Sequence, residues 1–164
     1  MAKQHRGRLI VAQIVTALQG MASPEYPMAV SAKRLPVITI EDLADDTADV
    51  TVAAMTKAGD EQDRGSELLL YGVTVGVTAK ATEPESATAD SVEDLIEQIQ
   101  NFLSEEGQRV WTLEADPGGG EFDWQAQLEL PFENNPIFNV KLLREVGIYQ
   151  SITVFNYLVE KTRI

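Results

Sequence analysis

One long stretch of the chain, residues 67–80, has apolar side chains at every second position. Successive side chains of a strand point to opposite faces of its sheet, so this alternation predicts a β-strand with one apolar face. The opposite face carries small residues, including Gly72 and Gly76. Glycines inside a strand indicate a bend, or the close approach of another backbone or helix. The fold of this chain must therefore include a sheet built around this strand.

Other segments extend the predicted sheet. Residues 50–55, 110–113 and 122–130 have the alternation of shorter strands. Residues 149–160 are apolar on both faces, which is typical of a central strand covered on both sides or of a strand at a subunit interface. Residues 36–43 predict one more short strand, and residues 57–66, which are rich in Gly and Asp, predict a loop.

Two segments have the periodicity of helices. Residues 6–21 and 91–103 place apolar side chains three and four positions apart, and Asp90 or Ser91 is expected to cap the second helix. Two strands follow each helix, which is the order of an α+β domain. We expect a mainly antiparallel β-sheet with two principal helices packed on it. It would form a single domain over residues 1–164, with an acidic, loop-rich insertion at about residues 41–66.

Charge and cysteine content exclude several classes of protein. The chain has 13 Lys and Arg against 26 Asp and Glu, a net charge of −13, and no Cys. Nucleic acids and anionic membranes both recruit basic side chains, so the charge disfavours specific binding to either. Without Cys there is no disulfide, thiolate metal site or thiol nucleophile. No apolar run reaches the length of a membrane span and no signal-peptide pattern is present, so we expect a soluble intracellular protein.

No combination of residues in the sequence predicts catalysis. His5 is the only histidine and lies in a basic terminal segment, whereas a catalytic triad needs a rigidly held base. Residues 60–71 resemble a calcium loop at one glycine but have Tyr71 where that loop needs Glu. We therefore expect no catalytic residue, no cofactor and no bound metal. The alternative is a small metal-dependent hydrolase that uses clustered carboxylates, which would require several acids to converge in one pocket.

The charges are unevenly distributed along the chain. Acids gather over residues 41–49 and 83–106, whereas three of the bases lie within the first eight residues. Asp42, Asp45, Asp46 and Asp49 are candidates for an acidic loop that faces a channel, with an ordinary solvated loop as the alternative. Repeated negative charge repels DNA only where many copies line one space, so the channel hypothesis requires an oligomer. The basic N-terminal segment would then face a partner.

Taken in order, these elements resemble the tail terminator (tail completion) and neck proteins of long-tailed bacteriophages. The matching features are the helix at residues 6–18, the strand at 67–79, the helix at 91–99 and the closing strands that end at 151–157. The resemblance implies a non-enzymatic virion assembly protein, whose small α+β subunits form a hexameric ring. Such a ring caps the tail tube and joins it to the head, so the implied partners are the tail tube protein and a head-completion or connector protein. It also implies assembly in the host cytoplasm, a place in the tail or neck of the virion, and DNA that passes through the ring without specific binding.

The two most apolar strands would supply core or subunit contacts. The candidates for the subunit interface are Leu69, Tyr71, Val73, Phe155 and Tyr157. A further alternative is a monomeric adaptor that binds another protein through an exposed sheet edge.

Overall fold

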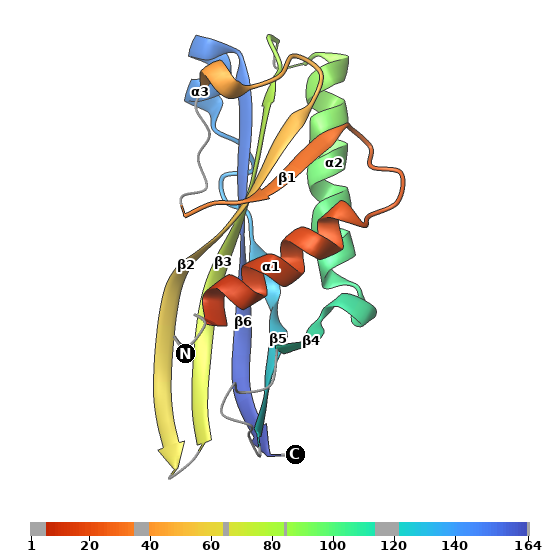
Figure 1. Cartoon of the computed structure of the whole chain (residues 1–164). Coiled ribbons are helices and arrows are strands. Elements are labelled where there is room, and N and C mark those ends of the chain that lie inside the picture. Colours follow the sequence, from red (N-terminus) through yellow and green to blue (C-terminus); the bar gives the residue numbers. More distant parts are fainter. Residues whose placement is uncertain (1–5, 35–39, 64–65, 84, 114–121, 164) are drawn as a thin grey trace.

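The computed structural model describes residues 6–34, 40–63, 66–83, 85–113 and 122–163. These residues form three α-helices and one mixed sheet of six strands, so the α+β class is confirmed (Figure 1). The expectation of two helices is wrong, because α3 (Val140–Val146) is a third one, capped by the side chain of Asn139. This short helix buries only Leu143, and it therefore has no periodic apolar stripe in the sequence.

The sheet has the strand order β1-β2-β3-β6-β5-β4 and is mostly antiparallel. Only β1 and β2 run parallel, while every other neighbouring pair is antiparallel. The strands are β1 (Met28–Ala32), β2 (Ala48–Asp63), β3 (Ser66–Lys80), β4 (Val110–Leu113), β5 (Phe122–Glu133) and β6 (Ile148–Arg163). Of the two alternatives for residues 149–160, the structure has the central position, since β6 lies between β3 and β5. The second face of β6 is not fully covered, because Ile152 is 37% exposed.

The first half of the chain differs from the sequence prediction at three places. Residues 57–63 are not a loop: β2 continues to Asp63 and pairs with β3 as far as Asp63 opposite Ser66. The predicted strand at 36–43 is wrong at Ile40–Asp42, which form the 3-10 helix η1, while residues 35–39 lie outside the described residues. Strand β1 was not predicted. β1 and the end of β2 are strands because their backbones pair with a neighbouring strand. Backbone pairing does not require alternating apolar side chains, so the sequence shows no strand pattern there.

The helices α1 (Arg6–Gln19) and α2 (Ala87–Ser104) confirm the two that were predicted. The predicted cap of α2 is wrong by about one turn. The Oγ of Ser86 caps the helix by accepting a hydrogen bond of 3.1 Å from the backbone N–H of Ala89. None of the described helices is long and apolar enough to cross a membrane.

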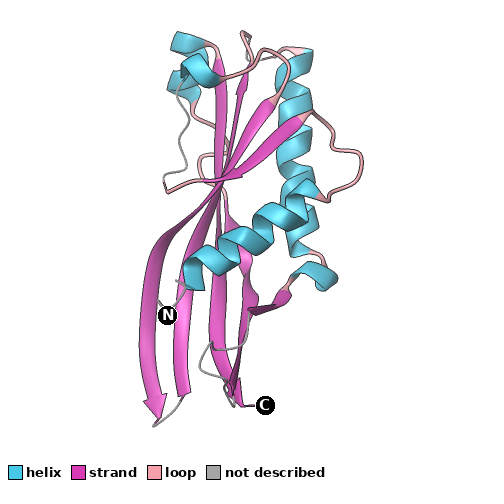
Figure 2. Cartoon of the chain, viewed as in Figure 1, coloured by secondary structure: helices cyan, strands magenta, loops and turns pink. Residues whose placement is uncertain are grey.

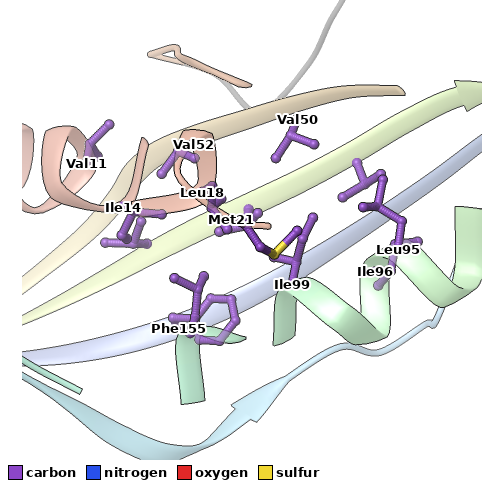
Figure 3. Close-up of a cluster of buried hydrophobic side chains, with 14 of the residues drawn as sticks. Val11, Ile14, Leu18, Met21, Val50, Val52, Leu95, Ile96, Ile99 and Phe155 are labelled. Atoms are coloured by element: carbon purple, nitrogen blue, oxygen red, sulfur yellow. The ribbon is translucent and has the colours of Figure 1, made fainter. Parts of the chain in front are cut away.

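Helices α1 and α2 pack on the same face of the sheet (Figure 3). Ile14 and Leu18 of α1, and Ile99 of α2, are buried against strand residues such as Val52 and Phe155 (Figure 3). Each fully buried aliphatic or aromatic side chain of this kind stabilises a fold by about 1.5–3 kcal/mol relative to its exposure. The apolar face of β3 belongs to this cluster. The face that the sequence alternation predicted is therefore the one that packs against the helices.

The strands are longer than the helices that cover them. β2, β3, β5 and β6 extend beyond α1 at the lower end of the molecule, where the picture contains strands alone (Figure 2). At the other end, η1 and α3 lie near the start of β6 (Figure 1). An ion pair of 2.8 Å between Lys80 and Asp45 ties the chain that follows η1 to the end of β3.

Candidate assembly surfaces

The five residues predicted for a subunit interface lie in the interior of the chain. Leu69 is 7% exposed, and Tyr71, Val73, Phe155 and Tyr157 are 0–1% exposed. Trp111 of β4 stacks on Tyr157 with ring centroids 5.3 Å apart. A side chain buried within its own chain offers no surface to another. These residues therefore act in the core, the first of the two roles that the sequence left open, and a subunit interface has to use other residues.

The four aspartates predicted for an acidic loop lie on three different kinds of structure. Asp42 lies in η1, and Asp45 and Asp46 are exposed in the connection to β2. Asp49 lies inside β2 and is half-buried, so its assignment to a loop is wrong. The alternation of residues 50–55 marks β2, but the polar character of Asp49 conceals that the strand begins at Ala48.

The environments of Asp45 and Asp49 shift the pKa of their carboxyl groups in opposite directions. The hydrogen bond and the charge of Lys80 lower the pKa of Asp45. Burial raises the pKa of Asp49, opposed by the charge of Lys33 and reinforced by that of Asp42. Among the described residues, no three carboxylate or histidine side chains are grouped as a metal site would require. The four aspartates of this segment therefore do not form a metal site.

The outer edge of β2 has two different parts. β1 pairs with β2 from Ala48 to Val52, and the backbone N–H of Lys33 donates one more bond to the carbonyl of Val52 at 2.9 Å. Beyond this point no described strand pairs with that side of β2, so residues 54–63 form what we call the free edge. Met55 on this stretch is 43% exposed. An unpaired edge presents backbone donors and acceptors that pair readily with another strand.

Strand β4 forms the opposite border of the sheet. It pairs with β5 on one side, and no described strand pairs with its other side. Its first residue, Val110, is 50% exposed. Among the described residues, the unpaired strand sides therefore include the second half of β2, which β1 does not reach, and β4, with β3, β6 and β5 between them.

Beside the free edge lies a cavity that we call the basic groove. Its volume is about 510 Å³, and it is lined by Arg8, Val11 and Ala12 of α1, by Ala32 of β1 with Lys33 and Arg34 just after it, and by Ala54 of β2. The three basic side chains are exposed and come from two segments that are distant in the sequence. Sequence reasoning noted only the basic character of the N-terminal segment. Only the packing of α1 against β1 and β2 brings Lys33 and Arg34 to it.

A second cavity, which we call the acidic groove, lies at the other end of α1. Its volume is about 560 Å³, and it is lined by Met21, Ala22, Glu25, Asp94, Glu97, Gln98, Asn101, Phe102 and Glu105. Gln98 joins its two walls: its Nε2 donates to the carbonyl of Ser23 at 3.2 Å, and its Oε1 accepts from the N–H of Glu25 at 2.8 Å. Four carboxylates line this groove, and no base does.

No family model matches the chain, and no curated protein matches its sequence.

Proposed function

We propose that this chain is a non-enzymatic assembly protein whose copies join border to border into a ring. The observation that carries the proposal is the pair of unpaired strand sides, the free edge of β2 beyond the reach of β1 and the outer side of β4, which face opposite ways in the strand order of the sheet. A contact between two different surfaces of identical subunits is heterologous, and such contacts close into a ring when their rotation permits. Strand pairing between copies would satisfy backbone groups that the isolated chain leaves unpaired.

The position of this ring in a virion is inferred from the resemblance to tail terminator and neck proteins. We propose that it is a tail terminator or neck ring of a long-tailed phage, with six subunits, which caps the tail tube and receives the head-completion or connector protein. It would assemble in the host cytoplasm and remain in the virion. The exposed side chains of Asp42, Asp45 and Asp46 fit a surface from which DNA is repelled as it passes.

The ring is tested by measuring the mass of the purified chain with size-exclusion chromatography and light scattering over a range of concentrations. We expect a discrete oligomer, and a ring at one end of purified tubes of the tail tube protein encoded near it, seen by electron microscopy. A strict monomer at high concentration that places no ring on tubes would overturn the proposal. It would favour instead a monomeric adaptor that uses the same free edge.

Substitutions at the two borders test the surfaces. Met55→Glu beside the free edge and Val110→Glu on β4 should each shift the mass toward the monomer, because they add charge where strands would meet. Val140→Glu is the matched control, since Val140 on α3 is 52% exposed and lies outside both borders. An equal effect of all three substitutions would contradict the assignment of the borders.

A further inference from the structure

The chain segregates its charges at the two ends of α1. The basic groove contains Arg8 near the start of this helix, and the acidic groove contains Met21, just past its end. At 1.5 Å per residue, the two grooves are roughly 20 Å apart along the helix. They are therefore two separate surfaces of opposite charge on one subunit.

The basic groove is unusual in a chain with a net charge of −13. Arg8 and Arg34 are exposed, and within the described part of the chain neither makes an ion pair. Arg8 lies in the first turn of α1, which contains no acidic residue to offset the positive end of the helix dipole. Basic side chains and the helix end together create a positive potential that attracts a partner of opposite charge.

Helix α2 presents the complementary charge. Its four ionisable residues are Asp90, Glu93, Asp94 and Glu97, and all four are exposed acids. Glu105, just past the end of α2, adds a fifth carboxylate beside the acidic groove. The end of α2 leads through η2 (Glu106–Gln108) to β4, so Glu105 is the acid of this groove nearest that strand along the chain. Asp94 and Glu97 line the acidic groove together with Met21, Ala22 and Glu25 of the connection from α1 to β1. The basic groove contains Ala54, so it lies at the free edge of β2.

We propose that the basic groove of one copy docks the acidic C-terminal half of α2 from a second copy. The inference rests on the proposed function, in which copies meet through two different surfaces, and charge complementarity selects these two oppositely charged surfaces as the pair. Like charges repel where two basic grooves or two acidic surfaces meet, so the same arrangement selects the head-to-tail order. The acceptor groups on α2 are Asp94 and Glu97, with Glu105.

Charge reversal tests the contact directly. Two double variants are needed: one combines Arg8→Glu with Arg34→Glu, and the other combines Asp94→Lys with Glu97→Lys. Each should weaken self-association by more than about tenfold, because it places like charges across the interface. The controls make the same change of net charge elsewhere on exposed residues: Lys141→Glu with Arg144→Glu on α3, and Glu83→Lys with Glu85→Lys before α2. The controls should leave the association constant within about threefold of the starting value, as expected for charges outside the interface.

Restoration distinguishes a docking contact from misfolding. A chain that carries all four reversals again has opposite charges across the contact, and so does an equimolar mixture of the two double variants. Both should recover assembly, which a misfolded variant could not do. Association of the unmodified chain should also weaken as NaCl is raised, since screening acts on exposed charge pairs.

Each outcome bears on one of the two proposals. The charge contact is wrong, while the ring stands, if the unmodified chain assembles but the variant with all four reversals and the mixture stay dissociated. The same conclusion follows if the control variants weaken assembly as much as the test variants do. If only the basic-groove variant dissociates, the groove binds some other anion and the inference is overturned. If the unmodified chain is a monomer under all conditions, the ring itself fails.

Discussion

The two halves of β2 are one continuous strand in opposite environments. Ala48, Val50, Val52 and Ala53 have no exposed surface, whereas residues 55–59 are all exposed. The first half has β1 on one side, β3 on the other and helix α1 across its face. The second half keeps β3 alone and extends past the helices (Figure 2). The change comes at an irregularity in the register between Ala54 and Thr56.

The difference between the halves shows which part of the strand serves stability and which is available to a partner. Burial on both faces fixes the first half in the core, so substitutions there act on folding. The second half contributes exposed side chains and a free backbone edge, so substitutions there should act on association. The predictions below test this division, beginning with the largest expected effect.

A buried charge gives the sharpest comparison of the two halves. Val52→Asp places a carboxylate among core side chains and should cost more than about 3 kcal/mol or prevent folding, because an unpaired buried charge is poorly solvated. Met55→Asp, three residues later, should change the free energy of unfolding by less than about 1 kcal/mol. Urea denaturation followed by circular dichroism measures both. Equal destabilisation would mean that the second half is also part of the core.

Shortening a buried side chain of α1 tests whether this helix buries the first half of β2. Ile14→Ala should destabilise the chain by about 2–5 kcal/mol, since Ile14 is fully buried in the cluster that includes Val50 and Val52. Leu9→Ala is the control on the same helix, and it should cost less because Leu9 is only partly buried. A larger loss from Leu9→Ala in thermal or urea denaturation would contradict this view of α1.

Gly72 gives an intermediate effect at the boundary between the halves. It lies opposite Thr56, and a Cβ at Gly72 would overlap the Oγ1 of Thr56. Gly72→Ala should therefore destabilise by about 1–3 kcal/mol. In a double-mutant cycle, Thr56→Ala should recover part of this loss. Simple addition of the two effects would show that the close approach is not the cause.

The smallest predicted effect comes from the half-buried Asp49 at the start of β2. Because burial raises its pKa above 3.8, folding favours the protonated carboxyl. The resulting stabilisation is fully present below pH 3.8 and is lost as the pH rises through the pKa of the folded state. Asp49→Asn should therefore raise the melting temperature slightly at neutral pH, and the gain should vanish below pH 3.8.

Asp45 is a control whose pKa shift has the opposite sign to that of Asp49. Lys80 lowers its pKa, so the stabilisation is present above the ordinary value of 3.8 and is lost as the pH falls. Asp45→Asn should leave the melting temperature at neutral pH unchanged or slightly lower. The same sign of change for both variants would contradict these environments.

The sequence predicted long, periodic elements well and polar or short elements poorly. The helix at residues 6–21 and the strands at 67–80 and 149–160 have strong apolar patterns, because each buries a whole face. The second half of β2 and the strand β1 depend on backbone pairing, which is nearly independent of side-chain identity. Helix α3 is too short to show a periodicity. Because backbone pairing leaves no apolar alternation in the sequence, residues 57–63 of β2 were predicted as part of a loop.

The candidate surfaces were less predictable than the core. The most apolar residues of the long strands, such as Tyr71 and Phe155, were equally compatible with core and interface, and burial resolved this in favour of the core. The two grooves combine residues from distant segments, for example Arg8 with Arg34, and Glu25 with Glu97. No local pattern marks such pairs.

The sequence alone determined the α+β class and the uneven charge, because periodicity and composition act locally along the chain. The tertiary structure decided which strand borders remain unpaired and which charged segments meet. Pairing and packing join residues far apart in sequence, and their outcome depends on the whole arrangement of the sheet. The free edge and the two grooves exist only at that level, and they carry the proposals for how copies of this chain associate.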